Sequence, residues 1–240
     1  MKTIIAGIIT VGPVLAFGQV VWTEDFDSLT LGQLHNQNGW FNNTLNTNVV
    51  AGGGSLPTAH SGNQMATNQP TLGGSFQNLH VPTGWNTRDA GKNTLVLTGA
   101  IYVSSGTANL GSAIFQVVGT NPSPSRMGFA GIAGDRFFFG TDANAQLGGV
   151  ASLDQWNILR IEVDTVNHTN AFYANGGLLG AGTYDSSLVL NNWGFSAVAL
   201  FGDVNKPVFY DSMSVEAVPE PITLLAIGIG SLVAFRRKRG

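Results

Sequence analysis

The chain has 240 residues, of which 32 are glycine, 10% are charged and none is cysteine. The lack of cysteine excludes disulfides and thiolate metal sites, so stability has to come from packing and hydrogen bonds. Between Gln19 and Val218 there are six lysines or arginines and thirteen acids, a formal net charge of −7, which argues against a nucleic-acid partner because such a partner requires a basic face.

Residues 1–18 have the three parts of a secretory signal peptide. Lys2 supplies the cationic start, residues 4–15 form the apolar stretch, and Ala16-Phe17-Gly18 is a small-x-small exit. Gly12-Pro13 would break a helix, which argues against a buried core element at this place. We therefore expect export, with signal peptidase as the first partner of the chain.

The middle of the chain is typical of β structure. Its apolar stretches are short and bounded by turn residues, without the 3.6-residue period of long helices. The pattern predicts strands at Val20–Phe26, Gln64–Thr67, Ser75–His80, Thr94–Val103, Ser112–Val118, Met127–Ala133, Arg136–Gly140, Trp156–Asp164, Asn170–Ala174, Gly194–Phe201 and Val208–Val215. So many short strands predict one all-β, two-sheet sandwich over residues 19–217, with Asn175-Gly176 as a hairpin turn.

Two segments resemble concanavalin A-like jelly-roll domains of exported bacterial proteins. The first is Glu24-Asp25-Phe26-Asp27, followed by Leu31-Gly32, Leu34 and Asn38-Gly39-Trp40. The second is Trp156–Asp164 with Asn170–Tyr173 and Asn175-Gly176, which is similar to the paired strands of laminin-G-like and legume-lectin-like sandwiches. The resemblance implies a jelly roll whose last strand, Val208–Val215, returns beside the first.

One stretch carries part of a glycosidase pattern. The resemblance includes glycosidases with Glu-x-Asp-x-x-Glu on a catalytic strand, but here Glu162 and Asp164 are followed by Asn167. A retaining glycosidase needs two carboxyl groups about 5 Å apart, and an amide cannot donate the proton. The strict alternation over residues 159–164 instead predicts a strand with an apolar core face and a charged solvent face. We expect a protein that is not an enzyme, with a divergent glycoside hydrolase as the alternative.

Other catalytic motifs are missing from the sequence. There is no Gly-x-Ser-x-Gly segment of a serine hydrolase and no glycine-rich phosphate-binding motif. The four histidines, His35, His60, His80 and His168, are scattered without the spacing of metal ligands. We expect them to be solvated residues of loops.

Calcium is the one cofactor that the resemblance suggests, because jelly-roll domains of this kind often bind it through carboxylates and asparagine carbonyls of loops. The nearest candidates are Asp185, Asp203 and Asn205, all in predicted loops. A lone aspartate in a loop is more often a turn former. We expect no other cofactor.

Sugar binding requires exposed aromatic rings that stack on the apolar faces of sugars. Trp85, in the turn-rich stretch Pro82-Thr83-Gly84-Trp85-Asn86, is the candidate ligand-binding residue. The alternative is a tryptophan that folds over the edge of the sandwich. Trp22, Trp40, Trp156 and Trp193 lie on or beside predicted strands and are expected in the core.

The tail, residues 218–240, has three parts. Pro219-Glu220-Pro221 is followed by the apolar run Ile222–Phe235 and then by the basic end Arg236-Arg237-Lys238-Arg239. As a helix the apolar run spans about 21 Å, less than the ~30 Å hydrocarbon core of a bilayer. Basic flanks stay on the cytoplasmic side, so the basic end is expected to stop the chain in the inner membrane.

This tail resembles the PEP-CTERM protein-sorting segment of exported proteins in Gram-negative bacteria. The resemblance implies that an exosortase-type membrane protease recognises Pro219-Glu220-Pro221 and removes the tail, in a system that accompanies exopolysaccharide and biofilm production. The alternative is an ordinary tail anchor behind a proline linker. We expect a membrane-bound intermediate and then a cell-surface or extracellular protein that binds polysaccharide, with a structural module without ligand as the other interpretation.

Overall fold

The computed structural model describes residues 18–42, 47–68, 75–82, 84–105, 110–199 and 207–219. The signal peptide before Gly18, the calcium candidates Asp203 and Asn205, and the tail beyond Pro219 lie outside these ranges. Among the described residues, no helix is long and apolar enough to cross a membrane.

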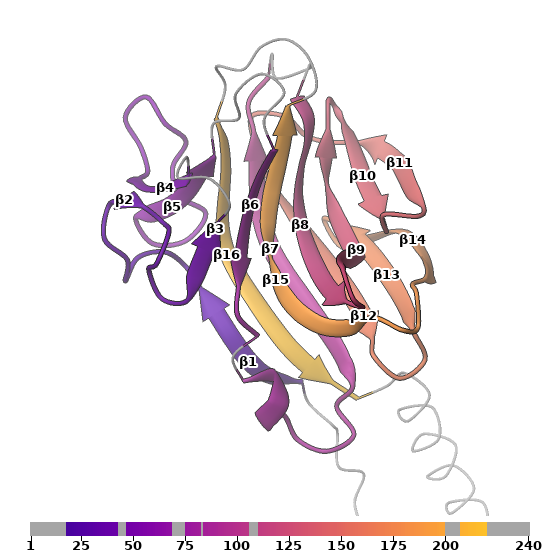
Figure 1. The fold of residues 1–240 in the computed structure, drawn as a ribbon. Coiled ribbons are helices and arrows are strands. Elements are labelled where there is room, and N and C mark those ends of the chain that lie inside the picture. The colour runs from indigo at the N-terminus through magenta and orange to yellow at the C-terminus, as the bar shows by residue number, and fades with distance from the viewer. Residues whose placement is uncertain are drawn as a thin grey trace, which may run out of the picture.

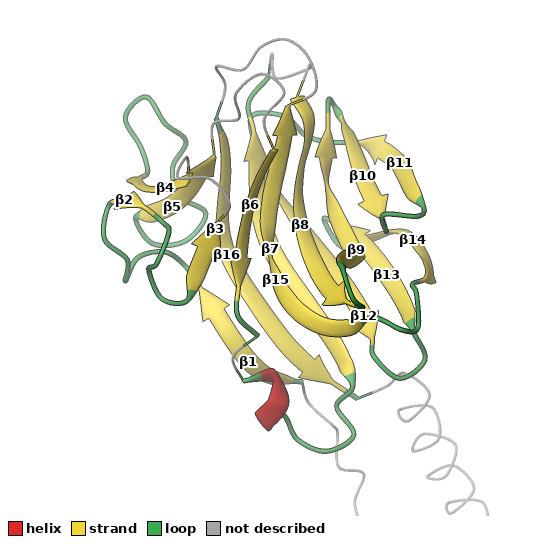
Figure 2. Ribbon diagram, viewed as in Figure 1, coloured by secondary structure: helices red, strands yellow, loops and turns green. Residues whose placement is uncertain are grey.

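Within the described ranges, sixteen strands form two antiparallel sheets that lie face to face (Figures 1 and 2). The larger sheet contains β1 (Gln19–Glu24), β2 (Gly32–Gln33), β4 (Thr47–Ala51), β5 (Gln64–Asn68), β7 (Thr94–Val103), β12 (Trp156–Asp164), β13 (Thr169–Ala174), β14 (Gly177–Thr183) and β16 (Val208–Val218). The smaller contains β3 (Trp40–Asn42), β6 (Ser75–His80), β8 (Leu110–Thr120), β9 (Pro124–Ala133), β10 (Arg136–Gly140), β11 (Ala145–Val150) and β15 (Val189–Ala199).

The strand order brings the end of the chain back beside its beginning. The nine-stranded sheet runs β14-β13-β12-β7-β16-β5-β4-β2, and β1 also pairs with β16. The seven-stranded sheet runs β11-β10-β9-β8-β15-β6-β3. The expected return of the last strand beside the first is therefore confirmed, as is the all-β sandwich.

All eleven predicted strands are present, and the prediction missed β2, β3, β4, β11 and β14. Two of the missed strands, β11 and β14, are the outermost strands at one end of their sheets and have mostly exposed residues. An exposed edge strand has no buried face, so its sequence lacks the apolar alternation by which strands are recognised. Gly148-Gly149 lies inside β11 and adds no apolar side chain to its sequence pattern.

The core consists of aromatic and aliphatic side chains that meet between the two sheets. Tyr210 of β16 contacts Phe195 of β15, with ring centroids 4.2 Å apart, and Phe115 of β8, at 5.6 Å. Gly99 of β7 makes room for this packing, because a Cβ at this position would lie 2.6 Å from the Phe115 ring. Burying one such ring contributes about 1.5–3 kcal/mol.

The hairpin between β13 and β14 turns where it was predicted. Asn175 and Gly176 both have positive φ angles, 49° and 83°, which is the conformation that a type I′ turn requires. The Asn175 side chain accepts a hydrogen bond from the backbone N–H of Ile158 at 2.8 Å, so the turn is also fastened to β12.

Residues of the segment from Trp22 to Trp40 form a buried polar cluster with His80, which was expected to be a solvated loop residue. His80 is not a solvated loop residue: it lies on β6 and is only 2% exposed. Its Nε2 atom is 3.2 Å from the indole Nε1 of Trp22 and 2.7 Å from the carbonyl oxygen of Asn38. The neighbouring strand β3 pairs Trp40 directly with His80, so this cluster joins β1, β3 and β6.

Candidate functional site

The outer face of the seven-stranded sheet is hollowed by a cleft of about 320 Å³, a volume within the range of small-ligand sites. Its lining combines apolar and polar side chains: Phe41, Leu79 and Val118 with Gln77, Arg126, Asp142, Asn191 and Asn192. These residues come from β3, β6, β8, β9 and β15 and from the loop after β10. The cleft therefore spans the sheet from the edge strand β3 to β9, where five strands and one loop meet.

The alternation of β8 and a bulge in its pairing with β9 place Val118 and Arg126 in this cleft. Phe115 and Val117 face the core between the sheets, so Gln116 and Val118 face the other way. The register between β8 and β9 shifts between Val117 and Val118 and pairs Val118 with Arg126. A bulge re-aims a side chain by inserting one residue into a ladder, and here it brings Arg126 onto the outer face.

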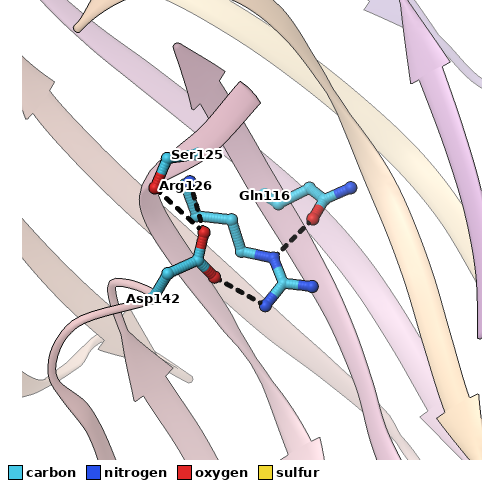
Figure 3. A network of polar contacts seen from close by, with 4 residues as sticks. All are labelled: Gln116, Ser125, Arg126 and Asp142. Atoms are coloured by element: carbon cyan, nitrogen blue, oxygen red, sulfur yellow. Dashed lines mark hydrogen bonds and ion pairs between the residues drawn. The ribbon is translucent and has the colours of Figure 1, made fainter. Parts of the chain in front are cut away.

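Arg126 is held from two sides (Figure 3). Its Nε atom donates to the amide oxygen of Gln116 at 2.9 Å, and its Nη1 atom donates to Oδ1 of Asp142 at 3.0 Å. The other oxygen of Asp142 accepts the backbone N–H of Arg126 at 2.8 Å and the hydroxyl of Ser125 at 3.1 Å. The guanidinium is therefore oriented before any ligand arrives, and neither contact uses its Nη2 atom.

Beneath Arg126 the face is aromatic, and one amide lacks a partner. The guanidinium lies over the ring of Phe129, 5.4 Å from its centroid, and Phe129 contacts Phe138 at 4.8 Å. Gln116 is fully buried, and among the described residues its Nε2 atom has no hydrogen-bond partner. Gln116 does not line the cleft, so its contribution is to hold the guanidinium of Arg126 in place.

Phe41 is the exposed aromatic ring at this cleft. It lies on β3 opposite Leu79 of β6, and 36% of its surface is exposed. The sequence pattern does not reveal Phe41 as a site residue, because β3 is only three residues long and was not predicted. Its neighbour Trp40 was expected in the core, and alternation along an extended segment would have placed Phe41 on the opposite, outer face.

Trp85, the predicted sugar-stacking residue, does not present an exposed ring. It lies in the short 3₁₀ helix η1 (Trp85–Thr87) and is 6% exposed. The guanidinium of Arg88 covers its ring at 4.3 Å from the centroid. The alternative, a loop tryptophan folded over the sandwich, is what the structure has, because the apolar ring gains more from burial than from solvent contact.

Trp156 was expected in the core and is instead half-buried on the outer face of the larger sheet. Its indole N–H donates to the carbonyl oxygen of Thr58 at 2.9 Å, and its ring meets His60 edge-on at 5.8 Å. The other three strand tryptophans, Trp22, Trp40 and Trp193, are buried as expected. Trp156 therefore fastens the loop before β5 to β12.

A second cleft, of about 560 Å³, is lined by Ser61, Ser212 and Glu24 among other polar residues and by Met213. Ser212 has a positive φ of 50°, and its hydroxyl is 2.8 Å from Nδ1 of His60. The buried carboxylate of Asp211 accepts from the backbone N–H groups of Ser61 and Ser212, at 3.0 and 2.6 Å. Burial raises the pKa of the Asp211 carboxyl above its usual range, and these N–H donors oppose the rise.

The hydrogen bonds of this cluster hold a loop to β16 and do not have the arrangement of a serine hydrolase. In a catalytic relay the acid holds the imidazole that activates the serine. Here the Asp211 carboxylate is bound by backbone donors of Ser61 and Ser212, and His60 is exposed. The cluster therefore ties the loop that contains His60 to β16, at the point where β16 passes from pairing with β5 to pairing with β1.

The partial glycosidase pattern does not assemble a carboxylate pair. Glu162 lies on the outer face of the larger sheet, where it forms an ion pair with Arg160 and accepts from the hydroxyl of Tyr173 at 3.4 Å. Asp164 was expected on the solvent face but is buried, because its carboxylate accepts the backbone N–H groups of Val166 and Asn167, both at 2.9 Å. Asp164 thus caps the turn after β12.

The remaining histidines and the described calcium candidate occupy ordinary turns. His35 and His168 are partly buried, and His168 meets Tyr184 edge-on at 5.6 Å. Asp185 accepts from the backbone N–H and the hydroxyl of Ser187 at 2.9 and 2.7 Å, and these bonds lower the pKa of its carboxyl. In the described part of the chain, no three histidine or acidic side chains are grouped so that they could hold a metal ion.

The fold is similar to solved structures of different activities. An endo-beta-1,4-glucuronan lyase from the fungus Trichoderma reesei matches with a TM-score of 0.53 and 11% identity, over 84% of this chain and 99% of that one. The receptor binding domains of botulinum neurotoxins G and D match with TM-scores of 0.51 each, at 11% and 8% identity, over 85% and 90% of this chain.

This chain spans 49% and 53% of the two toxin domains. At such identities the likeness shows the fold alone, a concanavalin A-like jelly roll that occurs in an enzyme and in binding domains alike. No curated protein sequence matches the chain.

The end of the chain matches a known sorting signal. The family model described as "PEP-CTERM protein-sorting motif" matches residues 217–239, which include the proline pair, the apolar run and the basic end. The motif implies an exported protein that passes through the membrane and is processed by exosortase-type machinery. The chain thus combines a concanavalin A-like jelly-roll sandwich with a C-terminal PEP-CTERM sorting motif.

Proposed function

We propose that the protein is a non-enzymatic polysaccharide-binding protein of the cell surface or extracellular matrix, and that it uses the cleft lined by Phe41 and Arg126. The observation that carries the proposal is the juxtaposition, in one cleft, of an exposed ring with a pre-oriented guanidinium. Sugars offer apolar ring faces for stacking and hydroxyls that accept hydrogen bonds, so both features serve one ligand.

The biological setting follows from the sorting motif. Tail removal at Pro219-Glu220-Pro221 would place the sandwich at the surface of a Gram-negative cell or in its matrix. Exopolysaccharide would be the polysaccharide available for binding there. The domain would then contribute to a biofilm by adhesion. Two other interpretations remain as outcomes of the tests: a structural module without ligand, and a divergent glycoside hydrolase.

Binding is tested with the purified exported protein on a glycan array and by calorimetry with polysaccharide from its host. Arg126→Gln keeps a side chain of similar length but lacks the charge, and it is expected to abolish binding. Arg160→Gln, on the outer face of the other sheet, is the matched control and is expected to bind as the wild type does. Absence of binding by the wild-type protein would favour the structural module.

Catalysis is tested on the same polysaccharides by measuring new reducing ends and unsaturated products. We expect neither. Turnover that disappears in Glu162→Gln would support the glycoside hydrolase instead, and turnover that does not depend on Glu162 would assign the catalysis to other residues.

The sorting step is tested by intact mass and by fractionation of cells of the native host. The wild-type protein is expected to lose its tail, and replacement of Pro219, Glu220 and Pro221 by alanine is expected to keep it in the membrane. A tail retained by both proteins would identify a plain anchor, and the proposed role in a biofilm would lose its main support.

A further inference from the structure

The two processed ends of this protein are neighbours in one sheet. β1 pairs with β16 in antiparallel register, with Gln19 opposite Ala217 and Val20 opposite Glu216. The predicted signal-peptide exit directly precedes Gln19, and the sorting motif begins at Ala217. Folding therefore brings together the two places at which the chain is expected to be cut.

The last residues of β16 are paired on both sides. On the side away from β1, Ala217 is opposite Leu95 and Val218 is opposite Thr94, both of β7. Val215 and Ala217 belong to the core between the sheets and are fully buried. A cut before Ala217 would remove a residue that pairs with both neighbouring strands, and a cut before Val218 would remove the partner of Thr94.

Proteases bind the substrate as an extended strand whose backbone groups pair with the enzyme, as in other cases of strand addition. In β16 these backbone groups already take part in the ladders to β1 and β7. The first residue beyond the strand is Pro219, which is itself buried. Proline has no N–H with which to extend a ladder, so sheet pairing ends at Val218.

The sequence leaves no spacer between this sheet and the apolar run. Only Pro219, Glu220 and Pro221 separate Val218 from Ile222. Three extended residues reach about 10 Å, which is short for a protease that has to grip residues on both sides of the cut bond. The protease thus competes with the sandwich for the end of β16.

We infer that the folded sandwich sets the upstream limit of tail removal: the sorting protease cuts beyond Val218, and the end of β16 has to open before it can do so. One peptide C–N bond is broken, with water supplying the hydroxyl of the new carboxyl terminus and a proton of the new amino terminus of the tail. The mature protein keeps the whole of β16, and its two ends lie side by side.

The position of the cut is tested by the intact mass of the mature protein from its native host. The expected mature chain ends at Val218 or later. A mature chain that ends at Ala217 or earlier, or a protein that keeps its tail, would overturn the inference.

The opening of β16 is tested by inserting Gly-Ser-Gly-Ser between Val218 and Pro219. Cleavage of a locally opened state follows the population of that state, so a spacer that removes the need to open is expected to raise the rate of tail removal about tenfold. The same four residues inserted between Gly54 and Ser55, in the exposed turn after β4, form the matched control. If the spacer variant unfolds thermally like the wild type and loses its tail at an unchanged rate, the end of β16 does not have to open before cleavage.

Limited proteolysis gives a readout that does not depend on the sorting protease or on glycan binding. In the purified full chain, proteinase K is expected to cut after Pro219 and to leave residues 208–218 intact. Early cuts within β16 would show that this strand does not protect the end of the domain.

Discussion

Glu24 and Trp40 are joined by a hydrogen bond of 3.2 Å from the indole N–H to Oε2 of the carboxylate. The same carboxylate accepts the backbone N–H of Phe26 at 2.8 Å and the amide of Asn38 at 3.1 Å, and Glu24 is only 3% exposed. A buried carboxylate is tolerated when donors surround it. The hydrogen bonds of the Glu24 carboxylate therefore hold β1 to β3 and stabilise the fold.

Replacing Glu24 by alanine is expected to lower the free energy of unfolding by about 3 kcal/mol, because it leaves buried donors without an acceptor. Urea denaturation measures the change. The control is Glu162→Ala, which removes a half-buried carboxylate with a surface ion pair and is expected to cost less than about 1 kcal/mol. Equal losses of unfolding free energy in the two variants would contradict a stabilising role of the Glu24 hydrogen bonds.

Replacing Phe41 by alanine is expected to weaken polysaccharide binding about tenfold, because a ring stacked on a sugar contributes on the order of 1 kcal/mol. Stability is expected to change little, since the ring is partly exposed. The control is Trp85→Ala, which is expected to cost about 3–5 kcal/mol of unfolding free energy while the folded fraction binds normally. Calorimetry and thermal unfolding separate the two effects, and lost affinity in Trp85→Ala alone would return the site to Trp85.

Replacing Asp142 by asparagine is expected to shift ligand preference toward acidic polysaccharides. Asp142 neutralises Arg126 through an ion pair of 3.0 Å. Asparagine lacks the negative charge of Asp142, so in this variant the guanidinium of Arg126 attracts a ligand carboxylate more strongly. The measurement is the ratio of affinities for an acidic and a neutral polysaccharide at low and high salt. An unchanged ratio would mean that Arg126 does not contact the ligand.

Buried tyrosines predict a loss of stability in alkali. Burial raises the pKa of Tyr210 and of Tyr184 above their ordinary value. The folded state therefore keeps its phenol protons when the unfolded state releases them near pH 10, so the stability that these groups contribute is present below about pH 10 and is lost as the pH rises further.

Tyr210→Phe is expected to cost about 1 kcal/mol at neutral pH, since the hydroxyl no longer donates to the carbonyl of Ser196. It is also expected to flatten the decline of stability above pH 10, with Tyr184 responsible for the rest. Urea unfolding at several alkaline pH values measures the slope. A slope equal to that of the wild type would show that Tyr210 ionises freely in the folded state.

The sequence by itself determined those features that depend on neighbouring residues. Alternation over Trp156–Asp164 predicted a strand with Leu159, Ile161 and Val163 in the core, and all three are buried. Asn175-Gly176 predicted a turn because these residues tolerate positive φ. The sorting motif is also local, since a proline pair, an apolar run and a basic end follow one another directly.

Only the tertiary structure decided which polar and aromatic side chains meet. Arg126 finds Gln116 and Asp142, which lie 10 and 16 residues away on either side, because β8, β9 and the loop after β10 become neighbours and a bulge turns the arginine outward. Trp85 is buried and Phe41 exposed although both are aromatic, since burial depends on which surface the rest of the chain covers. Residue type and spacing specify local conformation, whereas a binding site depends on contacts between distant segments that form only when the sheets assemble.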